Sequence, residues 1–168
     1  MHLGNGDNLM KDTHEHLVNT KFPEFELYDD SKKVITEKDI HGKWNIIFFY
    51  PKDESPGCTI QSCSFREKYE EFNDLNVQIY GVSSDSVSMH KAFKEKYNLQ
   101  FPLLSDKNGR LAQKLMLKKN FGFLDARVTL IVNPQGTITY VYTSQLRVTG
   151  HVKKALNAIK VQKYLIRI

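Results

Sequence analysis

The sequence predicts a single α/β domain whose central sheet contains both parallel and antiparallel strands. Apolar runs at 44–50, 77–82 and 128–132 have the composition of buried strands, and residues with helical spacing follow the first two. The third run is followed by a Pro/Gly turn and a further apolar run at 137–142, which is typical of an antiparallel hairpin. The 168 residues suffice for one domain with a full core.

The N-terminal part is expected to contain a tail and two added strands. Residues 1–20 are polar and lack an apolar secretory core, which predicts a flexible tail and no signal peptide. Residues 21–168 are expected to form the domain. Apolar residues from Phe22 to Leu27 predict an edge strand, and a turn then leads to a returning strand at 34–36.

Helices are expected between and after the core strands. One is predicted from Cys58 to about Leu75, and Ser83–Ser86 offers N-caps for a second. This second helix is expected to place three residues on one face: Met89, Phe93 and Tyr97. Leu103 and Leu104 lie in a short segment that ends at Ser105-Asp106. A short helix over 109–115 and a closing helix from about His151 complete the prediction.

The only two cysteines, Cys58 and Cys63, follow the first core strand and a rigid Pro/Gly loop. Two cysteines do not make a disulfide scaffold, and in a reducing compartment such a pair is typical of catalytic or metal-binding sites. Cys58 is predicted in the first turn of its helix. The free amides and the positive end of the helix dipole there favour an anionic sulfur.

The spacing of the two cysteines separates their roles. Positions five apart on a helix differ by about 140° in direction and about 7.5 Å in height. Their Cα atoms then lie beyond the roughly 7 Å that a disulfide tolerates. A Cys58–Cys63 bond therefore requires the first helical turns to unwind.

The cysteine segment resembles the active-site loop of peroxiredoxins, specifically the bacterioferritin-comigratory or peroxiredoxin Q branch. Pro51, Ser55 and Cys58 form the pattern Pro-x-x-x-Ser-x-x-Cys, and Pro-Gly-Cys-Thr at 56–59 is followed by Cys63. The similarity runs from about residue 22 to 159. It implies a thioredoxin-like fold with an N-terminal strand extension.

The resemblance implies a thiol-dependent peroxidase that needs neither metal nor organic cofactor. Cys58 would be oxidised by hydrogen peroxide or an organic hydroperoxide to sulfenic acid, and Cys63 would resolve it as an intramolecular disulfide. Thioredoxin or a similar dithiol would restore both thiols. The amides of Gly57 and Cys58 could point at the thiolate or at the peroxide oxygen.

Three further residues acquire roles from the same resemblance. Arg127, just before the 128–132 strand, would supply positive charge and fixed donors to the reacting oxygens. Ser55 would hold the peroxide, and Pro51 would limit water at the sulfur. Arg66 competes with Arg127, but eight positions along the helix place it about 12 Å from Cys58, where a structural salt bridge is the expected role.

Three other readings of the cysteines stay open. They could be inert buried thiols. Copper-delivery proteins of thioredoxin-like fold also carry two nearby cysteines, but theirs are separated by three residues and here four intervene. A disulfide oxidoreductase would require Cys-x-x-Cys and a proline before the 128–132 strand, and Arg127-Val128 stands there instead.

Charge and hydropathy indicate which partners the chain is expected to contact and where it is expected to be located. From Arg127 to Ile168 there are seven Lys and Arg residues and no acidic one, so the rest of the chain sums to about −2 of the net +5. A solvated basic helix is expected, and weak contact with nucleic acid or another polyanion is the alternative. No apolar run is long enough to span a membrane. A monomer in the cytoplasm is predicted, with the nucleus or an organelle lumen as alternatives.

The segment 116–125 departs from the peroxiredoxin pattern. It looks shorter than the aromatic, Gly-rich approach to the arginine strand that is usual in the family. Phe121, Phe123 and Leu124 in this segment could line an apolar substrate rim or simply pack, and packing is the expectation.

Overall fold

A seven-stranded mixed sheet is the centre of the computed structural model, which describes residues 13–119 and 125–166. The spatial order of its strands is β2-β1-β5-β4-β3-β6-β7. The strands have these bounds: β1 Glu26–Asp29, β2 Val34–Thr36, β3 Trp44–Phe49, β4 Val77–Ser83, β5 Leu103–Ser105, β6 Val128–Val132 and β7 Ile138–Thr143.

The strand directions confirm the predicted mixed α/β sheet. β3, β4 and β5 are mutually parallel, as expected of strands joined by helical crossovers. β6 runs antiparallel to β3, and β7 pairs with β6 across the turn at Asn133–Gly136. The five residues of β6 are all buried, which matches their uninterrupted apolar character.

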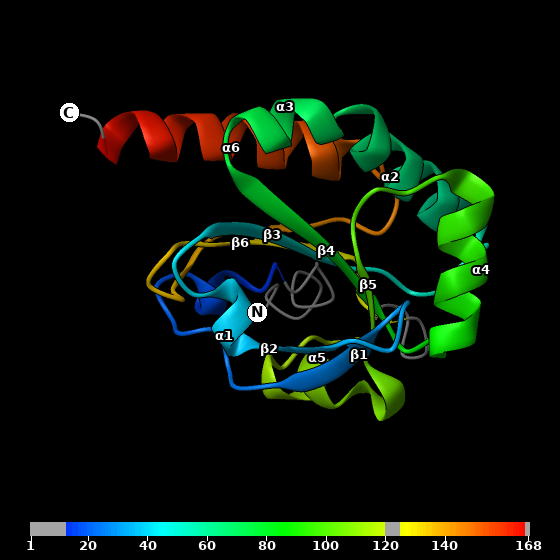
Figure 1. Ribbon diagram of the computed structural model, residues 1–168. Helices are drawn as coiled ribbons and strands as arrows, with labels where there is room; N and C mark the ends of the chain where they lie inside the picture. Colours follow the sequence, from blue (N-terminus) through cyan, green and yellow to red (C-terminus); the bar gives the residue numbers. More distant parts are fainter. Residues whose placement is uncertain (1–12, 120–124, 167–168) are drawn as a thin grey trace, which may run out of the picture.

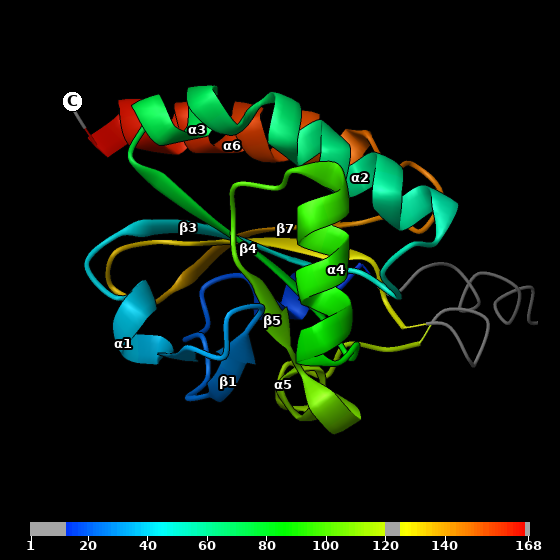
Figure 2. The same cartoon turned by 45° about the vertical axis from the view of Figure 1, so that its right-hand side comes forward.

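Helices cover the sheet on two sides (Figures 1 and 2). α2, α3 and α6 lie across one face, α4 packs beside β5, and α1 and α5 lie toward the opposite side. None of the helices in the described part combines the length and apolar character that a membrane span requires. The helices have these bounds: α1 Glu37–Ile40, α2 Pro56–Glu67, α3 Tyr69–Asp74, α4 Val87–Tyr97, α5 Arg110–Lys114 and α6 Gly150–Ile166, with short 3₁₀ turns η2 Glu15–Leu17 and η3 Lys107–Gly109.

The core has one cluster of buried side chains on each side of the sheet. In the cluster beneath α2 and α6, Phe48 of β3 stacks on Phe65 of α2 with ring centroids 4.4 Å apart. Cys58 belongs to this same cluster. The start of α2 is therefore held on the sheet by apolar packing, which each buried aromatic ring strengthens by removing a large apolar area from water.

The predicted edge strand from Phe22 to Leu27 is wrong in its bounds and its place. β1 begins only at Glu26, and it pairs with β2 on one side and β5 on the other, so β2 rather than β1 lies at this edge of the sheet. Phe22 and Phe25 are both buried and meet edge to face, with ring centroids 5.6 Å apart. Because both rings pack into the core, this segment lacks the alternation of buried and exposed side chains that a strand requires.

Residues 13–20 differ from the flexible tail predicted over 1–20. His14 and Leu17 are buried, and the His14 ring hydrogen-bonds the Thr143 hydroxyl at 3.0 Å. The Asn19 amide donates to the Ile138 carbonyl, which ties this segment to β7. Residues 1–12 lie outside the described part.

Two helix predictions are corrected. The stretch from Cys58 to about Leu75 is two helices, α2 and α3, because the backbone of Lys68 leaves the helical region with φ −99° and ψ 4°. In α4, Ser86 caps the helix as predicted, by accepting from the Met89 amide. Met89 is exposed, however, and His90 is buried in its place, because polar partners lie beneath that position.

Candidate functional site

Cys58 is the third residue of α2, in its first turn, as the sequence predicts. β3 ends at Phe49, the chain turns through 50–55, and Pro56 is the first helical residue, where the missing N–H is no loss. The first intrahelical hydrogen bond runs from the Thr59 amide to the Ser55 carbonyl. The amides of Gly57 and Cys58 therefore precede the helical ladder and are available to an anion.

The two cysteines occupy different environments on one continuous helix. Both are free thiols, with Cys58 fully buried and Cys63 half-buried. α2 is unbroken from Pro56 to Glu67. Five helical positions separate the two sulfurs by more than a disulfide spans, so the reduced state holds them apart.

The guanidinium of Arg127 lies against the start of α2. A Cβ atom at Gly57 would stand 3.2 Å from Arg127 Nη2, so this glycine lets the guanidinium approach the backbone closely. Arg127 is buried; its Nη1 donates to Gln61 Oε1 at 2.5 Å and its Nε to the Gln145 carbonyl at 3.1 Å. Because both acceptors are uncharged, the positive charge is free to stabilise an anion at the helix start.

Arg66 faces away from this chemistry. Its Nη1 donates to the Tyr97 carbonyl at 2.7 Å, and its Nη2 lies 3.9 Å from the Glu67 carboxylate. Arg66 thus joins α2 to the end of α4. These contacts support the structural role expected of Arg66 and favour Arg127 as the arginine of the site.

Ser55 and Pro51 shape the loop before the helix. The Ser55 hydroxyl donates to the Lys52 carbonyl at 2.9 Å and makes no side-chain cap for α2. Both residues are half-buried. The peroxide-holding role of Ser55 and the water-limiting role of Pro51 stay predictions.

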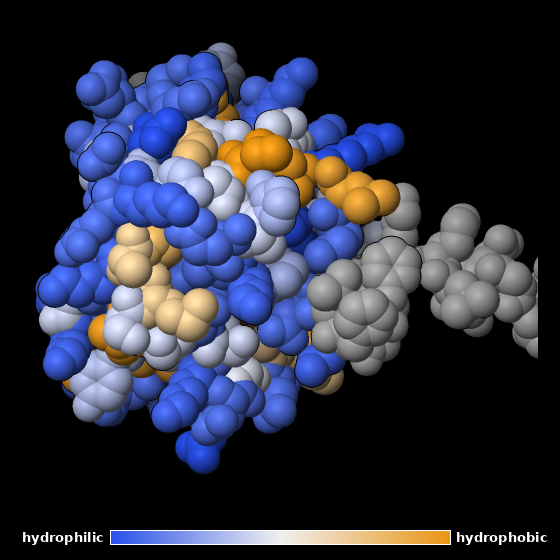
Figure 3. Space-filling view, turned by 90° about the vertical axis from the view of Figure 1, so that its right-hand side faces the viewer, coloured by the Kyte–Doolittle hydropathy of each residue, from blue (hydrophilic) through white to orange (hydrophobic). Residues whose placement is uncertain are grey.

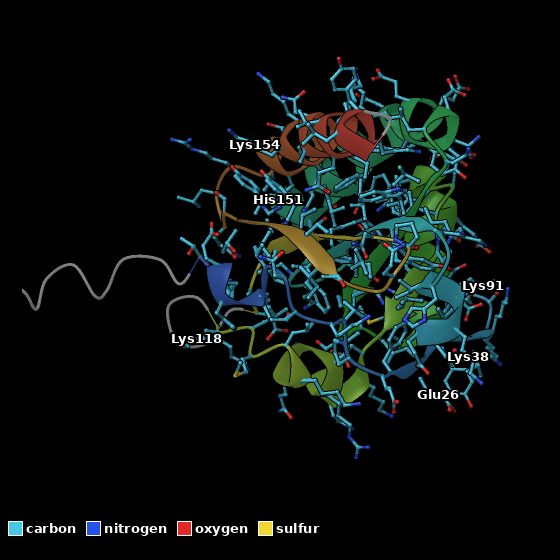
Figure 4. All side chains as sticks on the ribbon, turned by 90° about the vertical axis from the view of Figure 1, so that its left-hand side faces the viewer. Glu26, Lys38, Lys91, Lys118, His151 and Lys154 are labelled. Atoms are coloured by element: carbon cyan, nitrogen blue, oxygen red, sulfur yellow. The ribbon has the colours of Figure 1, made fainter. Side chains whose placement is uncertain are left out.

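His151, at the start of α6, supports the segment that contacts Arg127. Its Nε2 hydrogen-bonds the Ser144 carbonyl at 2.7 Å and its Nδ1 the Thr129 hydroxyl at 2.8 Å. Burial, followed by the Arg127 charge, lowers the pKa of His151 to about 4. The imidazole is therefore neutral at pH 7. It lies on the sheet side of α6, whereas Lys154 points to solvent (Figure 4).

Comparison with known proteins agrees with this geometry. Residues 18–141 match the AhpC/TSA family. The chain belongs to the AhpC/TSA family. It is 35% identical over 139 residues to the chloroplastic peroxiredoxin Q of Triticum aestivum, covering 82% of this chain but only 64% of that protein. To peroxiredoxin Bcp of Bacillus subtilis it is 38% identical over 149 residues, covering 85% of this chain and 94% of that one.

Solved peroxiredoxin structures have the same fold. Peroxidoxin BcpB from Mycobacterium tuberculosis superposes with a TM-score of 0.79 at 28% identity, covering 86% of this chain and 96% of that one. For a Xanthomonas campestris peroxiredoxin Q the TM-score is 0.75 at 31% identity, covering 82% and 90%. The predicted peroxiredoxin Q branch and thioredoxin-like fold are thereby confirmed.

Two sets of site residues escaped the sequence argument. Gln61 lies three positions after Cys58, on the same side of α2, and only this spacing could have indicated it. Asp53 and His90 form a buried pair 37 positions apart, for which no local pattern exists.

Part of the rim of the site is formed by residues that the structure describes. Ile60 on α2 and Leu146, next to the Gln145 that bonds Arg127, are exposed apolar residues, and Val148 would lie 3.4 Å from a Cβ atom at Gly57. Apolar side chains are visible among polar ones on the face that α2 and α4 present (Figure 3). The predicted packing of Phe121, Phe123 and Leu124 falls outside the described residues.

Proposed function

We propose that this chain is a thiol-dependent peroxidase that reduces hydrogen peroxide and organic hydroperoxides. One observation carries the proposal: the Cys58 thiol lies in the first turn of α2, where the Arg127 guanidinium packs against Gly57. The helix start and the guanidinium both favour a thiolate and the developing charge on the peroxide oxygens. Its relatives are named peroxiredoxins.

The reaction follows from the chemistry of the two thiols. The Cys58 thiolate attacks one peroxide oxygen, the O–O bond breaks, and the other oxygen leaves with a proton as water or alcohol. Cys58 is then a sulfenic acid. After α2 unwinds locally, the Cys63 sulfur attacks it, water leaves and the disulfide forms. Thioredoxin or a similar dithiol reduces this disulfide and is itself oxidised.

The apolar residues at the rim support organic hydroperoxides as substrates. Ile60 and Leu146 are 50% and 85% exposed, so they can contact an alkyl group that water solvates poorly. The bacterioferritin comigratory protein of Xanthomonas campestris, which is 30% identical to this chain, has an alkyl peroxide reduction activity.

Partners and location are further proposals. Lys153, Lys154 and Lys160 on the outer side of α6 support weak polyanion contact, and the chain is proposed to act as a monomer. A cytoplasmic location is proposed; the plant relatives are named chloroplastic.

Intact mass after one equivalent of hydrogen peroxide tests the function. The wild type should lose two hydrogens, because the disulfide forms. Cys63→Ser should instead gain one oxygen at Cys58, and Cys58→Ser should stay unchanged. Peroxide consumption by Cys58→Ser at the wild-type rate would refute the proposal. Turnover with thioredoxin, measured for hydrogen peroxide and an alkyl hydroperoxide in parallel, gives the substrate preference.

A further inference from the structure

A chain of buried polar side chains holds the loop that precedes Cys58. The Tyr50 hydroxyl donates to Asp53 Oδ1 at 2.6 Å, and His90 Nδ1 lies 2.6 Å from Asp53 Oδ2. Tyr50, Asp53 and His90 are each at most 1% exposed. Buried polar groups are strongly held when every member has a partner.

Asp53 is also fixed through its backbone. Its amide donates to Asp85 Oδ2 at 2.8 Å, and the same oxygen accepts from the Ser83 hydroxyl at 2.6 Å. On the far side, His90 Nε2 lies 3.0 Å from the Leu104 carbonyl. Asp53 is thereby connected to the ends of β4 and β5 and to α4.

The donors and acceptors among these buried side chains are well defined. Because a carbonyl only accepts, His90 Nε2 carries a proton, and the bond from Nδ1 to Asp53 holds whether the shared proton lies on the ring or on the carboxyl. Burial, followed by the Asp53 charge, raises the pKa of Tyr50 well above its usual value, so Tyr50 stays a donor.

Asp53, Asp85 and His90 do not make a ready cation site. Ligand atoms of Asp53, Asp85 and His90 lie within 4.8 Å of one another. However, both Asp53 oxygens and both His90 nitrogens already take part in hydrogen bonds within the protein. The arrangement is that of a structural clamp.

The loop is attached less firmly at the residue that follows Asp53. Glu54 has φ +65°, and its carboxylate accepts from Lys96 Nζ and from the Tyr97 hydroxyl, at 3.2 Å each and at an exposed position. Exposed pairs of this kind contribute little. Glu54 is thus held weakly, and the clamp lies only five positions before the thiol.

We propose that the Asp53–His90 pair is a positioning element for Cys58; this rests on the proposed peroxidase function. The pair fixes the upstream end of the loop, so that the start of α2 meets the Arg127 guanidinium in the reduced enzyme. It also stays closed while α2 unwinds, which confines the opening to residues after Asp53.

Two substitutions of His90 separate positioning from general stability. The amide nitrogen of Asn can occupy the place of Nδ1 and keep the bond to Asp53, whereas that of Gln occupies the place of Nε2 and keeps only the Leu104 contact. Oxidation of Cys58 by hydrogen peroxide should slow ~10- to ~100-fold in His90→Gln, as expected for a displaced reacting group. His90→Asn should stay within about threefold of the wild type, because the Asp53 contact persists.

The measurement is rapid-mixing kinetics with Cys58 oxidation and disulfide formation followed separately. Disulfide formation from the sulfenic acid should not slow in His90→Gln. Asp53→Ala, which removes the bonds to both Tyr50 and His90, provides a second variant if His90→Gln does not fold. Ile35→Ala in β2, a buried site away from the loop, should lower the melting temperature and leave the oxidation rate unchanged.

The outcomes are distinct. Wild-type oxidation rates in His90→Gln or Asp53→Ala would overturn the positioning role, and so would equal losses in His90→Asn and His90→Gln. A wild-type protein that does not react with peroxide would overturn the proposed function itself.

Discussion

Replacing Ser62 by Ala should slow disulfide formation, because Ser62 destabilises the helix that must open. Within the described residues, two buried side-chain atoms lack a hydrogen-bond partner: Ser62 Oγ and Gln61 Nε2. Both lie on α2 between Cys58 and Cys63. Unwinding α2 exposes these groups to water, which satisfies them, so their burial favours the open form.

The size of the effect follows from the cost of burying an unpaired polar group. Such a group costs about 1–3 kcal/mol, and each 1.4 kcal/mol changes an equilibrium constant about tenfold. Ser62→Ala should therefore reduce the open population, and with it the rate of disulfide formation, about 5- to about 150-fold. Oxidation of Cys58 itself should keep its rate, since it takes place on the closed helix.

Ser64→Ala is the matched control. It makes the same change two positions later and gains the same helix propensity. The Ser64 hydroxyl, however, already donates to the Ile60 carbonyl at 2.8 Å, so no unsatisfied group is removed. Ser64→Ala should form the disulfide at close to the wild-type rate.

Quenched-flow sampling with thiol alkylation and mass spectrometry measures the step directly. With excess peroxide, Ser62→Ala should also accumulate more Cys58 sulfinic acid, because the sulfenic acid waits longer for Cys63. If Ser62→Ala and Ser64→Ala formed the disulfide equally fast, the unsatisfied hydroxyl would not control the opening.

Two further changes test the electrostatics of the site. Arg127→Lys keeps the charge but loses the fork that reaches Gln61 and Gln145 together, so Cys58 oxidation should fall ~100-fold, while Arg66→Lys stays near the wild-type rate in the same assay. His151 has a pKa of about 4 in the fold against 6.5 normally, so the unfolded state binds more protons between these values and stability falls as pH drops through this window. Urea unfolding at pH 7 and pH 4.5 should show an extra loss of about 2 kcal/mol in the wild type relative to His151→Gln, and equal losses would contradict the burial argument.

Sequence reasoning succeeded where a local pattern determines the structure. The 128–132 strand is apolar at every position but Thr129, and Pro and Gly before Cys58 set the start of α2. Arg127 was reached only through the resemblance, because nothing in its neighbours places it beside Gly57.

The missed features depend on contacts between distant segments. His14 is ordered by Thr143, 129 positions away, and a polar N-terminus gives no sign of this. The pairing of Asp53 with His90 likewise exists only once α4 packs against the sheet. In α4 the same packing buries His90 and leaves Met89 exposed, although both fit the helical period.

The interruption at Lys68 limits how far a redox change can spread. If α2 opens through Cys63, only Ser64 to Glu67 remain of it, a stretch too short to persist as an isolated helix. The oxidised chain would then lose α2 as a unit. α3 begins a separate hydrogen-bonded segment at Tyr69 and keeps Phe72 in the core. Oxidation would thus unfold α2 as one cooperative unit and leave the neighbouring α3 folded. α2 would then refold when the disulfide is reduced to two thiols.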